Sequence, residues 1–248
     1  MALHRVVLVV AISLLNLQSS LQQTKPSSLK HITCGHKKNL HAGDCAAAYR
    51  KILYDGDSTL DQNESSAERT SGSCVTNIKN PKFMNVPKAI IENAFDQILA
   101  RCNSRSGSAA LPGFDGVRLS TRHHRHPSAS SWEDDMELNR VFCSNGPKGI
   151  KIVKQDCVEA YRLIPTNDSG RFVSVDQHVP MNSISSSVKK CVASVWTSDG
   201  SKVEAFKSDI EILFQKVMQE CDTRGGYIMT NGALGKNGKV SLLIWGRV

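Results

Sequence analysis

The strongest constraint on the fold is a cysteine-rich pattern that occurs twice along the 248 residues. Four cysteines of the first half, Cys34, Cys45, Cys74 and Cys102, correspond in order to Cys143, Cys157, Cys191 and Cys221 of the second. Around the second cysteine of each set, residues 44–52 and residues 156–164 share the pattern Asp-Cys-x-x-Ala-Tyr-Arg-x-Ile without a gap. This shared signature indicates a tandem duplication, so we expect two modules with the same fold.

Each copy carries two helical patterns. We expect Asp44 and Asp156 to cap a short first helix, after which Cys, Ala, Tyr and Ile recur at i, i+3, i+4 and i+7. A longer apolar stripe of the same kind covers residues 91–102 and 210–221. We therefore expect one short and one long helix in each copy, each with one buried face.

Strand signals are clearer in the second copy than in the first. In the second copy, β-branched and aromatic residues predict strands at residues 141–143, 172–175, 188–196, 227–230 and 240–245. In the first copy, residues 74–78 and 114–119 predict strands, and the polar residues 55–73 are interpreted as a loop. The predicted fold class is α+β: two tandem disulfide-stapled sandwich modules of the split βαβ type, each an antiparallel sheet with two helices on one face.

The pattern divides the chain into five parts. Residues 1–20 are interpreted as a signal peptide, because Arg5 precedes an apolar run that would rise only about 18 Å as a helix, against about 30 Å of bilayer core. A signal anchor is the alternative. A flexible lead-in (21–30), the first α+β repeat (31–119), a linker (120–139) and the second α+β repeat (140–248) follow, and the linker is recognised by its serines and Pro127.

The eight cysteines follow the signal peptide, so we expect disulfide bonds. None is spaced Cys-x-x-Cys, which disfavours zinc-ribbon and thioredoxin-like proteins. Four cysteines allow three pairings in each copy. If the first helix begins and the second ends at the same edge of the sheet, the favoured pairs are Cys45–Cys102, Cys157–Cys221, Cys34–Cys74 and Cys143–Cys191.

Three positions are candidate modification sites. Asn63 and Asn167 begin Asn-x-Ser triplets, the acceptor pattern for N-glycosylation. Arg122 and Arg125 have the Arg-x-x-Arg spacing that furin-like proteases accept, which makes Arg125 a candidate processing site. The alternative is an uncut, solvated linker.

Residues that could carry chemistry have simpler structural explanations. His123, His124 and His126 could bind a metal, but we expect solvated side chains on a linker. His31, His36 and His41 lie near Cys34 and Cys45, yet a disulfide-bonded cysteine offers no thiolate. Tyr49 and Tyr161 could be catalytic phenols, but at helix-face spacing they predict core residues with a hydroxyl at the rim. We expect no catalytic residue, no cofactor, no metal site and no enzyme activity.

Charge suggests partners only weakly. The net charge of +8 gives mild attraction to anionic surfaces. Lys37-Lys38 and Lys189-Lys190 are isolated pairs, and no basic run is interleaved with aromatic residues. We expect a monomer that binds no nucleic acid and does not insert stably into a membrane.

Three segments resemble a known group of proteins. Residues 54–61 (Tyr-Asp-Gly-Asp-Ser-Thr-Leu-Asp), 71–74 (Ser-Gly-Ser-Cys) and 94–102 (Ala-Phe-Asp-x-Ile-Leu-x-x-Cys) are similar to segments of small cysteine-containing secreted (haustorial) proteins of rust fungi. The order of helices and strands is similar to that of smut-fungus killer toxins. The resemblance implies a fungal virulence effector that acts in or around plant tissue, and it transfers no catalytic residue.

The leading hypothesis is a secreted, extracellular, non-enzymatic effector that binds a host plant protein through loops on a duplicated disulfide scaffold. One alternative is a killer-type toxin that perturbs membranes or competing cells. Another is a secreted hydrolase or protease inhibitor. The host target and translocation into host cells stay open at this point.

Overall fold

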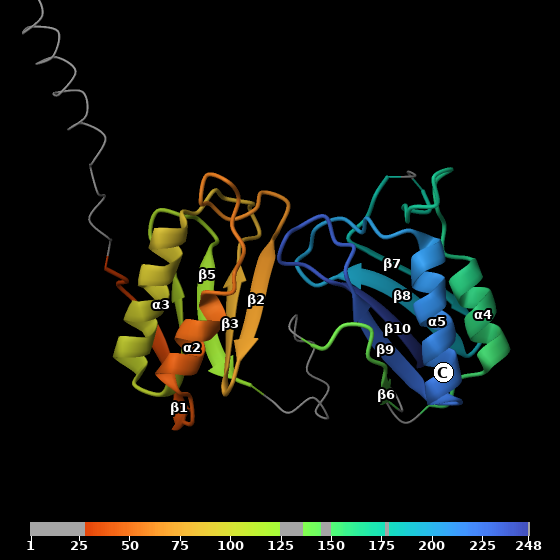
Figure 1. Cartoon of the computed structure of the whole chain (residues 1–248), viewed down its shortest axis with the longest axis horizontal. Helices are drawn as coiled ribbons and strands as arrows, with labels where there is room; N and C mark the ends of the chain where they lie inside the picture. Colours follow the sequence, from red (N-terminus) through yellow and green to blue (C-terminus); the bar gives the residue numbers. More distant parts are fainter. Residues whose placement is uncertain (1–27, 125–135, 145–149, 177–178, 248) are drawn as a thin grey trace, which may run out of the picture.

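The computed structural model describes residues 28–124, 136–144, 150–176 and 179–247. It shows two α+β modules, each with a five-stranded antiparallel sheet and two helices (Figure 1). The predicted fold class is confirmed.

The two modules share one order of elements and one sheet topology. The first consists of β1 (Ile32–Lys38), α2 (Ala42–Tyr49), β2 (Ser66–Ser71), β3 (Cys74–Lys79), α3 (Lys88–Cys102), β4 (Arg105–Ala110) and β5 (Arg118–His123). The second consists of β6 (Phe142–Ser144), α4 (Lys154–Arg162), β7 (Ser183–Val188), β8 (Cys191–Thr197), α5 (Lys207–Cys221), β9 (Gly225–Thr230) and β10 (Val240–Gly246). The sheet orders β1-β4-β5-β3-β2 and β6-β9-β10-β8-β7 are equivalent, so the duplication extends to the topology.

The predicted helical stripes form the core between helices and sheet. Tyr49 of α2 stacks on Phe95 of α3 with ring centroids 5.2 Å apart, and Tyr161 stacks on Phe214 at 4.6 Å in the second module. Such aromatic pairs add about 0.5–1.5 kcal/mol beyond the burial of their area. In both copies the repeated Tyr therefore joins the short helix to the long one.

The expected helix caps are wrong. The capping positions are His41 and Val153, and Asp44 and Asp156 lie in the first turn. The Asp44 carboxylate accepts a hydrogen bond from the Ser73 amide at 2.8 Å. Asp156 accepts one from the Lys190 amide at 3.2 Å. These amides belong to the turns after β2 and β7, so each aspartate fastens a β-hairpin to a helix.

Several strands differ from the expectation, and the two unexpected strands, β2 and β7, are polar. Residues 172–175 form only isolated bridges, and the strand beside β8 is the serine-rich β7. The predicted strand at residues 188–196 is divided by a turn at Lys189, and β2 lies inside the expected loop at residues 55–73. Residues 120–123, which the expected linker included, belong to β5.

All eight cysteines are disulfide-bonded, but the expected pairs are wrong. The bonds are Cys34–Cys102, Cys45–Cys74, Cys143–Cys221 and Cys157–Cys191, in place of the expected Cys45–Cys102, Cys34–Cys74, Cys157–Cys221 and Cys143–Cys191. The expectation placed the start of the first helix and the end of the second at one edge of the sheet. Instead, α2 and α4 contact the β2–β3 and β7–β8 hairpins, whereas α3 and α5 contact the edge strands β1 and β6.

The pairing can be tested by counting free thiols. The double variant Cys45→Ser/Cys74→Ser removes one disulfide and should show no free thiol in a denatured thiol assay, with a loss of about 3–4 kcal/mol of unfolding free energy in the chain-entropy model. Cys45→Ser/Cys102→Ser should instead leave two partnerless cysteines. The opposite thiol counts would contradict the structure.

Candidate functional site

Buried polar side chains gather where the second module meets the first. Loops of the second module lie beside β2, the edge strand of the first sheet (Figure 1). We call this contact the joint. Its residues are Leu53, Asp55, Asp61, Glu64, Ser65 and Arg69 of the first module and Asp199, Lys236 and Asn237 of the second.

Asn237 is the centre of the joint. It lies in the β9–β10 loop (residues 231–239), is 0% exposed, and makes six hydrogen bonds to the first module. Its side-chain oxygen accepts from the Leu53 amide (2.8 Å) and the Arg69 guanidinium (2.6 Å), and its Nδ2 donates to the Leu53 carbonyl (2.9 Å) and Glu64 Oε2 (2.6 Å). Its backbone amide donates to Glu64 Oε1, and its carbonyl accepts from Arg69 at 3.0 Å. Every hydrogen-bonding group of the side chain is thus used across the joint.

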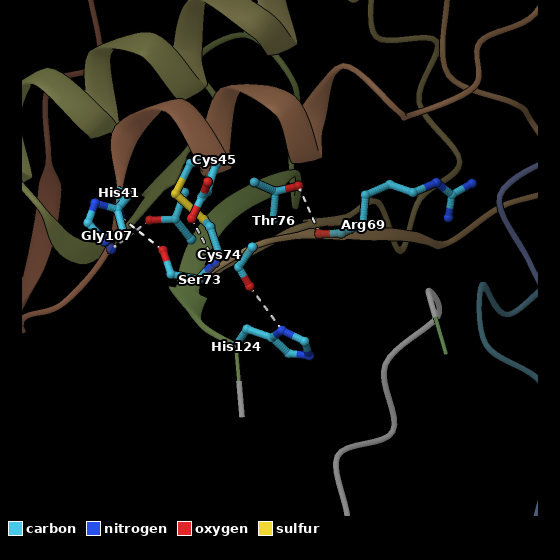
Figure 2. The surroundings of a disulfide bond; sticks show 11 residues. His41, Cys45, Arg69, Ser73, Cys74, Thr76, Gly107 and His124 are labelled. Atoms are coloured by element: carbon cyan, nitrogen blue, oxygen red, sulfur yellow. Dashed lines mark hydrogen bonds between the residues drawn. A yellow bond between two sulfur atoms is a disulfide. The ribbon is translucent and has the colours of Figure 1, made fainter. Parts of the chain in front are cut away.

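Arg69 supports this contact from β2. The side chain is only 5% exposed and extends away from the nearby disulfide (Figure 2). Besides Asn237, its guanidinium donates to the carbonyls of Lys51 and Glu68. A buried guanidinium needs several acceptors, and here most of them are backbone carbonyls rather than carboxylates.

Glycines allow the second module to approach closely. A Cβ on Gly235 would lie 2.4 Å from Glu64 Cγ of the first module, and one on Gly200 would lie 2.1 Å from Ser65 Oγ. Gly200 also has φ of +77°, which favours glycine. Behind this turn, the Asp199 carbonyl accepts hydrogen bonds from the amides of Ser65 (2.9 Å) and Ser66 (3.1 Å). The glycines therefore permit backbone contact between the modules.

The joint encloses two carboxyl groups with shifted pKa values. Burial is the main reason why the pKa of Glu64 is raised to about 7; hydrogen bonds from Asn237 lower this pKa, and the nearby Asp199 and Asp61 carboxyls raise it. Burial also raises the pKa of Asp199. At the rim, Lys236 pairs with Asp55 at 2.7 Å, and its amide donates to Asp61 at 3.3 Å.

The candidate residues from the sequence lie elsewhere. Asn63 and Asn167 are exposed, and Asn63 lies next to the joint. Arg125 and His126 lie outside the described residues. The structure brings His41 and His124 to the two sides of the turn after β2, near the Cys45–Cys74 disulfide (Figure 2). No group of three or more metal-ligating side chains occurs within the described ranges.

The candidate catalytic groups have structural roles. Cys34 and Cys45 are disulfide-bonded, so no thiolate is present beside His31, His36 or His41. Tyr49 donates to Asp96 Oδ1 at 2.7 Å, and burial raises its pKa to about 12. Tyr161 donates to the Lys207 carbonyl at 2.8 Å, and burial raises its pKa as well. Both tyrosines are core residues whose hydroxyl lies at the rim.

Sequence reasoning missed the whole joint. Glu64 lay in an expected loop, and Asn237 in a glycine-rich connection without apolar periodicity. One usable signal was present: the connection between β9 and β10 (residues 231–239) is longer than its counterpart between β4 and β5 (residues 111–117). A loop that is longer in only one copy indicates a structural feature that the two copies do not share.

Comparisons with known proteins show only distant likeness. No family model matches the chain, and no curated protein matches it. The tandem DUF26 ectodomain of the Arabidopsis thaliana cysteine-rich receptor-like protein PDLP8 matches with a TM-score of 0.30 and 10% identity, covering 90% of this chain and 100% of that one. The corresponding ectodomain of PDLP5 matches with a TM-score of 0.27 and 7% identity, covering 87% and 99%. These values assign neither a family nor an activity.

Replacing Asn237 tests the joint. Asn237→Ala leaves buried groups of Glu64, Arg69 and Leu53 without partners, so we expect a loss of about 2–4 kcal/mol of unfolding free energy. We also expect separate unfolding transitions for the two modules in calorimetry. Asn231→Ala, an exposed position of the same loop, is the matched control and should change little. Equal stability of the two variants would contradict the role of Asn237.

Proposed function

We propose that the protein is a secreted, non-enzymatic effector that binds a host plant protein through loops of its second module. The observation that carries this proposal is that the same region of the duplicated scaffold has different surroundings in the two modules. In the first module, the loop before β2 and the strand β2 itself contact another folded surface, the second module. In the second module, the equivalent region makes no such contact among the described residues.

The two equivalent edge strands make this contrast clear. Ser66, Glu68 and Thr70 of β2 are buried, and the Ser66 amide donates to the Asp199 carbonyl of the second module. Ser183 and Ser185 of β7 are exposed. The scaffold therefore presents, in its second copy, the region that already serves for protein contact in its first copy.

The open region also exposes apolar side chains. Leu163, Val175, Val179 and Phe206 are 63%, 67%, 43% and 40% exposed, and we call these four residues the open surface. The Ser174 amide, next to Val175, donates a hydrogen bond to the Val179 carbonyl at 2.8 Å. The bridge between Arg171 and Phe206 connects the loop after α4 with the loop before α5. Apolar groups exposed in neighbouring loops fit a protein partner better than a small polar ligand.

The titratable groups support a binding role over a catalytic one. The carboxyl groups whose pKa is raised by burial, Glu64 and Asp199, are enclosed in the joint, where the second module covers them. Across the described residues, no helix is long and apolar enough to span a bilayer. Four disulfides fit an oxidising, extracellular location.

Secretion and processing can be measured on the native protein. We expect intact mass spectrometry to find a chain that lacks residues 1–20, carries glycans at Asn63 and Asn167, and is cut after Arg125 where a furin-like protease is present. A retained N-terminal segment would contradict secretion by signal-peptide removal.

Host binding can be tested on the open surface. Oxidised protein should capture a saturable partner from plant extract, and Val175→Glu and Phe206→Glu should each weaken capture at least about tenfold, because a charge would be buried against the partner. Phe83→Glu is the matched control, since Phe83 is an exposed apolar residue of the first module. Capture that the first two variants leave unchanged would contradict the proposal. Growth inhibition or vesicle leakage without a protein partner would support the killer-toxin hypothesis instead.

A further inference from the structure

Two carboxyl groups from different modules meet inside the joint. Glu64 is 2% exposed and Asp199 is 0% exposed. Both lie against Gly235: a Cβ on this glycine would be 2.0 Å from Asp199 Oδ2 and 2.8 Å from Glu64 Oε1. The two oxygens are therefore less than about 5 Å apart. At this distance and burial, two negative charges repel strongly, and the pair favours holding one proton.

Hydrogen bonds indicate where the proton resides. Both oxygens of Glu64 accept from Asn237, so Glu64 has donors suited to a carboxylate. Asp199 Oδ1 accepts from the amide (3.0 Å) and hydroxyl (2.9 Å) of Ser201. Asp199 Oδ2 is buried without a hydrogen-bond partner. A proton on Asp199 Oδ2 would remove this uncompensated charge and place a donor within about 5 Å of Glu64 Oε1.

The other charged groups around Glu64 do not neutralise the pair. Asp61 adds a negative charge from the same loop. Arg69 of β2 donates to Asn237 and to carbonyls. Lys236 of the β9–β10 loop is exposed and paired with Asp55; the charges of Asp61 and Glu64 also raise its pKa, but it forms no ion pair with either. Closing the joint thus brings together three carboxyl groups, with the nearby cations engaged elsewhere.

We propose that the joint is a proton-dependent lock, in which the Glu64–Asp199 pair takes up one proton as the two modules close on each other. Acid then holds the modules in one fixed arrangement, and alkaline conditions release them. The protonation state of the pair thus determines whether the two modules form one continuous surface. It does not depend on the identity of any partner.

The sign of the pH dependence follows from the closed state. In the closed state the pair holds its proton more tightly than a free carboxyl does, because the pKa of Glu64 is raised from its ordinary value of 4.5 to about 7. Because the closed state binds the proton more tightly, closure is favoured most below pH 4.5 and loses this contribution as the pH rises through 7. Protonation of Asp199, whose pKa is also raised, acts in the same direction.

Hydrogen exchange of the full chain can test the lock. The amides of Ser65 and Ser66 donate across the joint to the Asp199 carbonyl, so their protection reports closure. After correction for the intrinsic exchange rate, we expect their protection to fall about tenfold or more between pH 5.5 and pH 8. Amides of the Tyr49–Phe95 core should keep their protection. Equal protection of the joint at both pH values would overturn the proposal.

A substitution separates the lock from a general effect of pH. Asp199→Asn removes one charge of the pair, so the fall in joint protection between the two pH values should become smaller. Asp176→Asn, at an exposed position of the same module, is the matched control and should keep the pH dependence. Glu64→Gln removes the other charge and should also reduce the dependence, and the double variant should abolish it. If either joint variant keeps the full pH dependence, the lock is wrong, whatever the outcome of the host-binding experiment.

Discussion

The arrangement of the two modules depends on the burial of one amide side chain. Asn237 is enclosed by the first module, and each of its donors and acceptors meets a complementary group of Leu53, Glu64 or Arg69. A buried polar group is stable only when it is hydrogen-bonded, so few positions of the β9–β10 loop are compatible with this contact. Hydrogen bonds are directional, so they fix how the two modules are placed at the joint. An apolar contact would allow the modules to slide against each other. The same geometry brings the Asp199 carboxyl beside Glu64 and links the joint to proton binding.

Duplication gave the two modules one scaffold and two different roles. In both copies, a tyrosine of the short helix stacks on a phenylalanine of the long one, and two disulfides hold the helices to the sheet. The copies differ in the edge strand that follows the short helix. Arg69 of β2 meets the partner module, whereas the corresponding strand β7 carries serines and remains exposed. One scaffold therefore contains both an internal contact and, among the described residues, an exposed surface at the equivalent place.

Much of the fold was predictable because its signals are local. The helical spacing of Cys45, Tyr49 and their repeats indicated a buried face, and that face forms the core. The interpretation of Asp44 as a cap was wrong, because an aspartate before a helix has the same local pattern whether it binds its own helix or a distant turn. Strands β2 and β7 were missed since edge strands with few apolar residues lack the alternation that marks a half-buried strand. The joint was missed because it depends on groups more than 130 residues apart, such as Glu64 and Asn237.

The sequence by itself determined that two copies of a disulfide-bonded α+β module exist, because repeated cysteines and apolar spacing are properties of neighbouring residues. Only the tertiary structure decided which cysteines pair, since the pairing follows from the half of the sheet that each helix covers. It alone also decided that Asn237, Glu64 and Asp199 meet. Polar contacts between distant loops depend on position and orientation in space, and neither leaves a periodic trace along the chain.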